Sequence, residues 1–279
     1  MKMYFFKDEI LTKIGIFDSG VGGLTIASKI QERASKHKII YYADNAFFPY
    51  GSKDEDIVIQ RSIYLTKQLL SEGCNIIIVA CNTASSAALE LLRKQFDVPI
   101  IGIEPAVKPA MENTSSGKAL LLATPLTTTG ERLSRLEKNY VDQGQLYSLP
   151  MEGLAEKIEL GLLSKDSLMS ELQFILDEYY HLGVDALILG CTHYYFLKKY
   201  LSEISPAHIL IFDSINGVIK RIEKIISEEM NNDQVEQVHE NIDCYVTGNI
   251  TSFMVSITSI IDYGFELPKL LIMKKNHIE

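Results

Sequence analysis

Asn75-Ile-Ile-Ile-Val-Ala-Cys81-Asn-Thr-Ala-Ser-Ser-Ala-Ala-Leu89 is the stretch that decides the fold. Its apolar, β-branched run predicts a buried strand that ends at Cys81. Asn82 and Thr83 then offer N-cap side chains to a helix of small residues. The thiol would therefore lie at the carboxyl end of a strand, beside the free N–H groups of a helix start. Such a position lowers the pKa of a thiol and binds carboxylates.

A second stretch, Asp185-Ala-Leu-Ile-Leu-Gly-Cys191-Thr-His193, repeats this pattern. An apolar strand again leads to a cysteine, and polar residues that can cap a helix follow it. A lone cysteine after a buried strand is usually a small core side chain. Two cysteines in matching contexts instead indicate a paired function for Cys81 and Cys191.

The composition bounds the class of protein. The chain has 279 residues, 47% of them hydrophobic and 23% charged, and a net charge of −9. These values are typical of a globular protein with one large or two ordinary domains, and the negative charge disfavours nonspecific nucleic-acid binding. The first residues lack the apolar core of a signal peptide, and no apolar run has the length of a membrane span. We therefore expect a cytoplasmic protein with neither a nucleic-acid nor a membrane partner.

The four cysteines are Cys74, Cys81, Cys191 and Cys244. They form no CxxC pair, so no metal site is expected. In the cytoplasm the thiols would stay reduced. We interpret Cys74 and Cys244 as structural, since neither follows the strand-to-helix pattern.

Apolar runs that alternate with helical segments predict a parallel α/β fold. Strands near residues 14, 39, 76 and 100 recur near 119, 145, 186 and 209, about 105–110 residues later, which indicates an internal duplication. We therefore expect two similar parallel-sheet α/β domains that face each other across a central cleft. The first would comprise residues 1–104 plus 214–279 and carry Cys81. The second would comprise residues 105–213 and carry Cys191.

A glycine-rich turn, Ser19-Gly20-Val21-Gly22-Gly23, lies between the first strand and the first helix. Such turns often bind an anion through backbone N–H groups. The glycine spacing is not GxGxxG, and the lysine of a nucleotide-binding P-loop is missing. No dinucleotide or nucleotide cofactor is therefore expected.

Chemically active side chains gather at the predicted strand ends, where ligands of open parallel sheets bind. They are Asp18-Ser19, Tyr50-Gly51, Cys81-Asn82-Thr83, Thr124, Glu152 and Cys191-Thr192-His193. Two thiols across a cleft fit a reaction in which one thiolate removes a proton from a carbon acid and the opposite thiol returns one to the other face. Asp18, Glu152 and His193 could tune the thiols or carry their protons. The hydroxyl and amide groups would hold the carboxylate and ammonium of an amino acid.

Several blocks resemble the aspartate/glutamate racemase family, and within it the glutamate racemases. They are Ile14-Gly-Ile-Phe-Asp-Ser-Gly-Val-Gly-Gly-Leu-Thr25, Tyr42-Ala-Asp-Asn with Pro49-Tyr-Gly51, Ala80-Cys-Asn-Thr-Ala84, Ile103-Glu-Pro105 and Leu189-Gly-Cys-Thr-His193. The resemblance runs in order from about residue 14 to 262. It implies a cofactor-independent enzyme that interconverts L- and D-glutamate through Cys81 and Cys191 and supplies D-glutamate for peptidoglycan. It also implies a homodimer.

The resemblance also assigns site residues. Asp18 would assist Cys81, His193 would assist Cys191, and Glu152 would be a second carboxylate on the Cys191 side. The implied substrate contacts are Asp18, Ser19, Tyr50, Gly51, Asn82, Thr83, Thr124, Thr127, Thr192 and His193. The chain departs from the family pattern at Thr128-Thr-Gly130 and at Tyr194-Tyr-Phe196.

Two other functions remain open from the sequence. An aspartate racemase, or a member acting on a related substrate such as a hydantoin, would use the same cysteine turns. The Asp-Ser-Gly-Val-Gly-Gly and Pro-Tyr-Gly blocks favour glutamate. A duplicated module that only binds a small acid is the non-enzymatic alternative, but it would not need two thiols.

Overall fold

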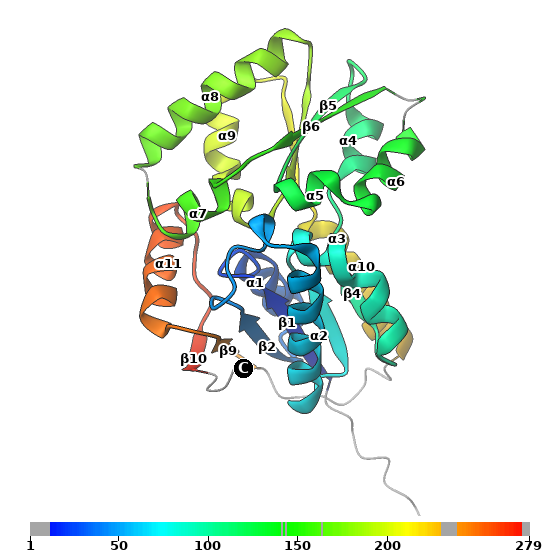
Figure 1. Ribbon diagram of the computed structural model, residues 1–279, viewed down its shortest axis with the longest axis vertical. Coiled ribbons are helices and arrows are strands. Elements are labelled where there is room, and N and C mark those ends of the chain that lie inside the picture. Colours follow the sequence, from blue (N-terminus) through cyan, green and yellow to red (C-terminus); the bar gives the residue numbers. More distant parts are fainter. Residues whose placement is uncertain (1–11, 141, 143, 163, 230–238, 275–279) are drawn as a thin grey trace, which may run out of the picture.

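The computed structural model describes residues 12–140, 142, 144–162, 164–229 and 239–274. Within these residues the chain forms two parallel sheets, one in the lower and one in the upper half of the molecule (Figure 1). The predicted fold class, two similar parallel-sheet α/β domains, is thereby confirmed. The predicted residue boundaries stay a prediction, and residues 1–11 and 275–279 lie outside the described part.

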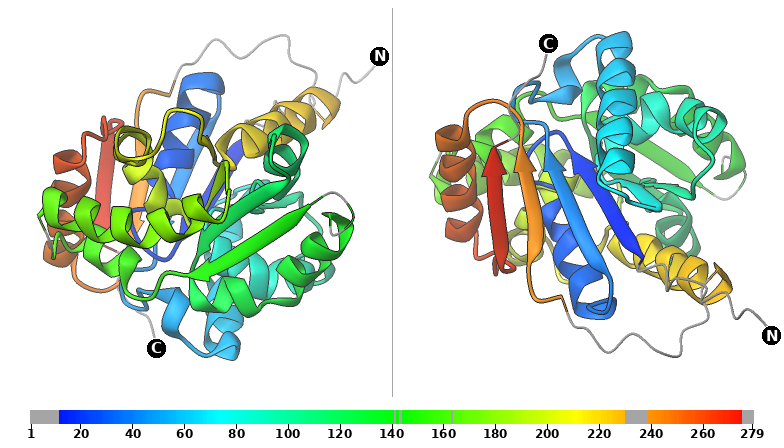
Figure 2. Two further views of the ribbon diagram at one scale, coloured as in Figure 1. Left: turned by 90° about the horizontal axis from the view of Figure 1, so that it is seen from above. Right: turned by 90° about the horizontal axis from the view of Figure 1, so that it is seen from below.

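The first sheet has six strands in the described part of the chain, in the order β10-β9-β2-β1-β3-β4. Their bounds are β1 (Lys13–Asp18), β2 (Lys38–Ala43), β3 (Ile76–Val79), β4 (Ile100–Gly102), β9 (Ile242–Val246) and β10 (Leu270–Lys274). All neighbours pair in parallel. Because β9 pairs with β2, the chain returns to this sheet after it has built the second one. Figure 2 shows β10, β9, β2 and β1 side by side in its right-hand view.

The second sheet has four described strands in the order β6-β5-β7-β8. They are β5 (Lys118–Ala123), β6 (Gln145–Pro150), β7 (Ala186–Gly190) and β8 (Leu210–Phe212). These pairs are also parallel. The order repeats the β2-β1-β3-β4 order of the first sheet, so the two sheets share one winding pattern.

Helices cover the sheets and connect the strands. With the first sheet lie α1 (Leu24–Arg33), η1 (Tyr50–Ser52), α2 (Glu55–Ser71), α3 (Asn82–Gln95), α10 (Ile215–Glu229) and α11 (Ile250–Asp262). With the second sheet lie α4 (Val107–Asn113), which precedes its first strand, and then α5 (Pro125–Thr129), α6 (Glu131–Tyr140), α7 (Leu154–Glu159), α8 (Lys165–His181), η2 (Thr192–Leu197) and α9 (Lys198–Ile204). The sequence patterns predict most of these elements but miss α4, α5, α9, β10 and the short 3-10 helices η1 and η2.

The apolar strand residues are divided between the two faces of each sheet. In β3, Ile76 and Ile78 pack toward α1 and α10, whereas Ile77 and Val79 pack toward α2 and α3. This alternation is the two-residue period of a strand whose faces are both covered. It explains why the decisive strand is a continuous apolar run rather than an alternating one.

The winding of the sheets fixes where polar side chains can meet. In each sheet the chain reverses its direction of winding beside the pair β1 and β3, or β5 and β7. Ligand sites of open parallel sheets lie beyond the carboxyl ends of such strands. Asp18 ends β1, and Cys81 follows β3; Thr124 follows β5, and Cys191 follows β7.

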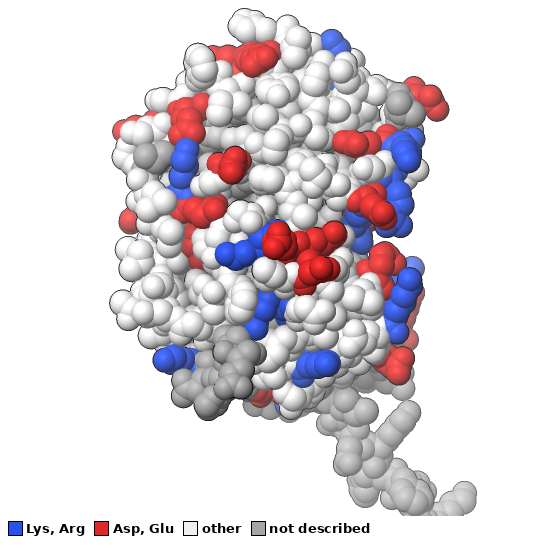
Figure 3. Space-filling view, in the orientation of Figure 1, with Lys and Arg blue, Asp and Glu red and all other residues white. Residues whose placement is uncertain are grey.

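The surface carries acidic and basic side chains interspersed with neutral ones (Figure 3). Acidic side chains gather on this face at the start of α2, where Asp54 is the N-cap and Glu55 and Asp56 lie in the first turn. Carboxylates at a helix start favour the helix because they oppose its dipole. In the described residues no helix has the length and hydropathy needed to cross a bilayer.

Candidate active site

Cys81 is buried at the point where β3 passes into α3. It is the extended N-cap residue of α3, and its carbonyl accepts a hydrogen bond from the Ser85 N–H at 2.9 Å. Burial raises the pKa of its thiol, and the charge of Asp18 raises it further, while the Ala84 N–H lowers it. The predicted lowering of this thiol pKa is therefore wrong. The helix start acts in the predicted direction, but burial of the thiol outweighs it.

Asp18 joins the two halves of the site. Its carboxylate is fully buried; one oxygen accepts the Gly20 N–H at 3.0 Å, and the other accepts the Thr192 hydroxyl at 3.1 Å. Burial raises its pKa, and a charged His193 opposes that effect. Ser19 completes this group, with its hydroxyl 3.4 Å from Asp18 and 4.0 Å from the Cys81 sulfur.

Cys191 lies at the equivalent point of the second sheet, between β7 and η2. Its buried sulfur is 3.8 Å from His193 Nδ1. His193 Nε2 forms a hydrogen bond with the carboxylate of Glu159. Burial alone would lower the pKa of His193, but its hydrogen bonds to Cys191 and Glu159 raise it well above the usual value. Cys191 also raises the pKa of Cys81, so the two thiols lie within electrostatic reach of each other.

Glu159 replaces the predicted Glu152 as the carboxylate on the Cys191 side. Glu152 is exposed on the turn before α7, whereas Glu159 is fully buried at the end of that helix. The sequence held a signal for this residue. Glu159 lies on the same helix face as Leu154, Ala155 and Ile158, all buried. A carboxylate at such a position needs a buried partner.

The glycine-rich turn binds an anion, as its sequence predicts, and the anion is the Glu159 carboxylate. The Val21 N–H donates to Glu159 Oε2 at 3.1 Å. A Cβ on Gly20 would lie 2.1 Å from that oxygen, and a Cβ on Gly22 would lie 2.5 Å from the Thr192 hydroxyl oxygen. These glycines therefore permit the close approach of the second half of the molecule to the first.

Three threonine hydroxyls from both halves form a buried cluster. Thr83 of α3 lies 2.9 Å from the Thr124 hydroxyl, which lies 2.9 Å from Thr127. Asn82 is buried beside them in sequence, and neither atom of its amide has a hydrogen-bond partner within the described residues. Buried polar groups of this kind require a partner, so this cluster has the donors and acceptors that a small polar ligand needs.

Tyr50 and Gly51 lie in η1 next to this cluster. The Tyr50 hydroxyl donates to Asp44 at 2.6 Å, and Arg61 pairs with the same carboxylate. A Cβ on Gly51 would lie 2.7 Å from the Thr124 Cβ. The hydroxyl of Tyr50 is thus used to fix η1, and the backbone at Gly51 borders the threonine cluster.

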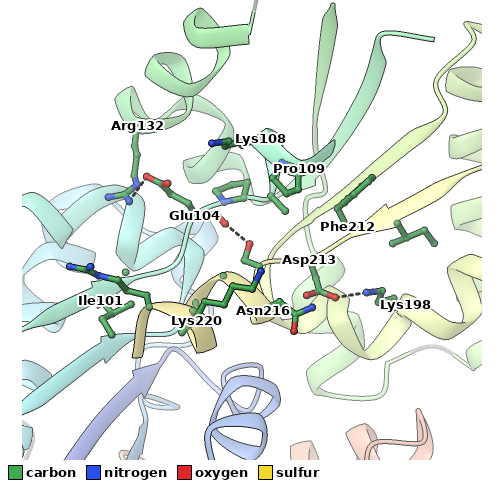
Figure 4. A pocket seen from close by; sticks show the side chains of 18 of the residues that line it. Ile101, Glu104, Lys108, Pro109, Arg132, Lys198, Phe212, Asp213, Asn216 and Lys220 are labelled. Atoms are coloured by element: carbon green, nitrogen blue, oxygen red, sulfur yellow. Dashed lines mark hydrogen bonds and ion pairs between the residues drawn. The ribbon is translucent and has the colours of Figure 1, made fainter. Parts of the chain in front are cut away.

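A separate cavity of about 710 Å³ lies where the chain crosses between the sheets (Figure 4). The first crossing contributes Glu104, whose carbonyl accepts a hydrogen bond from Ser214 of the second crossing. Arg132 pairs with Glu104, and Lys198 pairs with Asp213 at 2.5 Å. Neither Cys81 nor Cys191 lines this cavity, so it is distinct from the group of side chains around the two cysteines.

The described residues contain no group of three or more His, Cys, Asp or Glu side chains arranged to hold a metal ion. The clustered groups are instead two thiols, each with an acid–base partner: Asp18 beside Cys81, and His193 beside Cys191. This arrangement can move protons on two sides of a small ligand.

A sequence model of the Asp/Glu/Hydantoin racemase family matches residues 14–219. The chain belongs to this family. The glutamate racemase of Pseudomonas aeruginosa is 38% identical over 215 residues, which are 77% of this chain and 81% of the relative. A Clostridium botulinum glutamate racemase is 36% identical over 211 residues, covering 76% and 82%.

Solved structures of the family agree with the fold. Escherichia coli glutamate racemase, in complex with L-glutamate and the activator UDP-MurNAc-Ala, matches with a TM-score of 0.80 at 28% identity, over 94% of this chain and 98% of that one. The Francisella tularensis enzyme in complex with D-glutamate matches with a TM-score of 0.79 at 25% identity, over 95% and 98%. These relatives confirm the predicted resemblance to glutamate racemase and the enzyme class, an amino-acid racemase and thus an isomerase.

Proposed function

We propose that this chain interconverts L- and D-glutamate by moving a proton at Cα between Cys81 and Cys191. The names of the relatives support the reaction, and the two glutamate complexes of related enzymes support the substrate. The observation that carries the mechanism is the placement of the two thiols. Each follows the equivalent strand of its own sheet, and each has its own acid–base partner.

The protonation states suit a two-base reaction. Burial and Asp18 raise the pKa of Cys81, so this sulfur holds its proton at neutral pH. We take Cys191 as the base of this step, because its sulfur lies 3.8 Å from the imidazole of His193. The Cys191 thiolate then removes the Cα proton of one enantiomer, and the Cys81 thiol donates its proton to the opposite face. When the product leaves, Cys81 is the thiolate and Cys191 is the thiol. That form of the enzyme accepts the other enantiomer.

The remaining polar groups would hold the substrate. Removing the Cα proton places negative charge on Cα and its carboxylate, and donors fixed in advance stabilise such charge best. Among the residues that the structure describes, the buried amide of Asn82 has no hydrogen-bond partner, and Thr83 and Thr124 bring hydroxyls from both halves. We assign these groups to the carboxylate and ammonium of glutamate, together with Ser19, Tyr50, Gly51, Thr127 and Thr192.

The wider biological role belongs to the same proposal. D-Glutamate made by this chain would supply peptidoglycan synthesis in the cytoplasm, and the enzyme would act as a homodimer. The two catalytic units would be residues 1–104 plus 214–279 and residues 105–213. The mechanism uses protein groups alone and requires no cofactor.

Proton exchange at Cα, followed by NMR in heavy water, tests the reaction and the substrate together. Separate samples of L-glutamate, D-glutamate and L-aspartate are incubated with the enzyme. Exchange with inversion for both glutamates, and none for aspartate, is the expected result. Exchange of aspartate would make the chain an aspartate racemase, and binding without exchange would make it a binding module. The same assay applies to Cys81→Ser and Cys191→Ser, which should abolish racemisation. Cys74→Ser and Cys244→Ser are the matched controls, since both of these cysteines are buried outside the site.

A further inference from the structure

The carboxylate of Glu159 has four hydrogen-bond donors, and three of them come from the first half of the molecule. Oε1 accepts from Asn45 Nδ2 at 3.0 Å and lies 3.3 Å from the Ser256 hydroxyl. Oε2 accepts from the Val21 N–H at 3.1 Å and pairs with His193 Nε2. Every lone-pair direction of this carboxylate is therefore used.

The end of α7, where Glu159 lies, is docked on α11. The two helices lie side by side (Figure 1) and contact each other. Ser259 of α11 donates a hydrogen bond to the carbonyl of Ile158 at 2.5 Å. Phe253, Ile257 and Ile260 anchor α11 in the core. The position of the Glu159 carboxylate is therefore set by a helix of the first half.

These contacts decide where the Glu159 carboxylate lies. A buried carboxylate is tolerated only where donors replace water. Asp18 and Tyr41 also face this group, and the negative charge of Asp18 opposes that of Glu159. The Asn45, Ser256 and Val21 donors counter that repulsion. Without them, the carboxylate would lose the contacts that aim it at His193.

We propose that Asn45 and Ser256 are positioning residues of this reaction: they hold the Glu159 carboxylate aimed at His193. Because both residues belong to the first half and Glu159 to the second, the charged His193–Glu159 pair is complete only where the two halves meet. This proposal rests on the proposed function and deepens it, since it explains what orients His193, the proton partner of Cys191. Neither residue touches the thiols in this role.

Ser256→Ala and Asn45→Ala test the proposal, with Thr258→Ala as a matched control on the exposed side of α11. The measurement is the pH titration of the His193 imidazole by nitrogen-15 NMR, alongside kcat and KM. The chain has six histidines, so His193→Gln assigns the signal. Loss of one donor leaves the carboxylate less firmly aimed at His193, and the Glu159 contact is what raises the pKa of His193, so the titration midpoint should fall by about one pH unit. We expect kcat to fall about tenfold with little change in KM.

The control and the conservative variant sharpen this result. Thr258→Ala should match the parent enzyme, and Ser256→Thr, which keeps the hydroxyl, should restore the midpoint. A fall in kcat with an unmoved midpoint would show a merely structural role and overturn the proposal, as would an unmoved kcat and midpoint in both alanine variants. The titration does not depend on turnover. A shifted midpoint in an enzyme that fails to racemise glutamate would therefore reject the proposed function and keep the positioning role.

Discussion

The two cysteines of this site have different surroundings, and the surroundings determine the role that we propose for each. Cys81 and Cys191 follow the same kind of strand, yet Cys81 lies near a carboxylate and Cys191 near an imidazole. The first environment raises the pKa of the Cys81 thiol, whereas the second places a proton carrier, His193, beside the Cys191 sulfur. One chemical group repeated in two environments thus supplies both an acid and a base.

Substitution of the two glutamates separates the buried carboxylate from the exposed one. Glu159→Gln keeps the size of the side chain but removes the charge opposite His193, so kcat/KM should fall about 100-fold, as for loss of an acid–base partner. Glu152→Gln changes an exposed side chain and should leave kcat/KM within about twofold. Steady-state racemisation followed by circular dichroism measures both. Equal losses in the two variants would contradict the assignment of Glu159.

The raised pKa of His193 makes stability depend on pH in a defined direction. A histidine whose pKa is raised by folding stabilises the protein fully below its unfolded value of about 6.5, and this contribution is lost as pH rises through the folded pKa. The difference in free energy of unfolding between the parent and His193→Gln should therefore narrow as pH rises above about 6.5. Urea unfolding at a series of pH values measures it. A difference that grows with pH would mean that His193 is neutral in the folded protein.

At the scale of elements, the sequence predicts the strands and helices whose apolar residues form a regular pattern. The strands β1, β2, β3, β5 and β7 span four to six residues and are built on apolar runs, and a run of this kind is readable without a partner. The short helices α4 and α5 carry Pro109, Pro125 and several threonines, which a local pattern assigns to loops. Strand β10 (Leu270–Lys274) is itself a short apolar run, paired with β9 at the edge of the sheet, and the sequence patterns missed it. Tertiary contacts decide the two short helices.

The glycine-rich turn gives a prediction at the same scale. Gly22→Ala would place a Cβ 2.5 Å from the Thr192 hydroxyl oxygen and 2.7 Å from His193 Nδ1. Because both lie in the site, kcat/KM should fall about 100-fold, a loss typical of a misplaced catalytic group. Gly217→Ala in α10 is the control, as a Cβ there meets no atom within 4 Å, and it should stabilise the fold by about 0.5–1 kcal/mol. Thermal unfolding and racemisation assays measure both. An active Gly22→Ala enzyme would show that the halves need not approach so closely.

At the scale of the whole molecule, the site exists because two sheets of the same winding bring the carboxyl ends of their strands together. Which residues lie at strand ends is readable from the sequence, and so Asp18, Cys81, Cys191 and His193 could be named from it. The contacts made between the halves are not local. The raised pKa of Cys81 and the burial of Glu159 depend on residues far along the chain, so local patterns missed both.

The central claim is that each thiol serves one face of the substrate. The most direct test is Cα exchange in heavy water with Cys81→Ser and Cys191→Ser, each given L-glutamate and D-glutamate separately. Each variant keeps one thiol, which can remove and return a proton on its own side only. We expect that neither variant inverts glutamate and that each exchanges one enantiomer, the opposite one in the two variants. Inversion by either variant, or exchange of the same enantiomer by both, would contradict a two-cysteine mechanism.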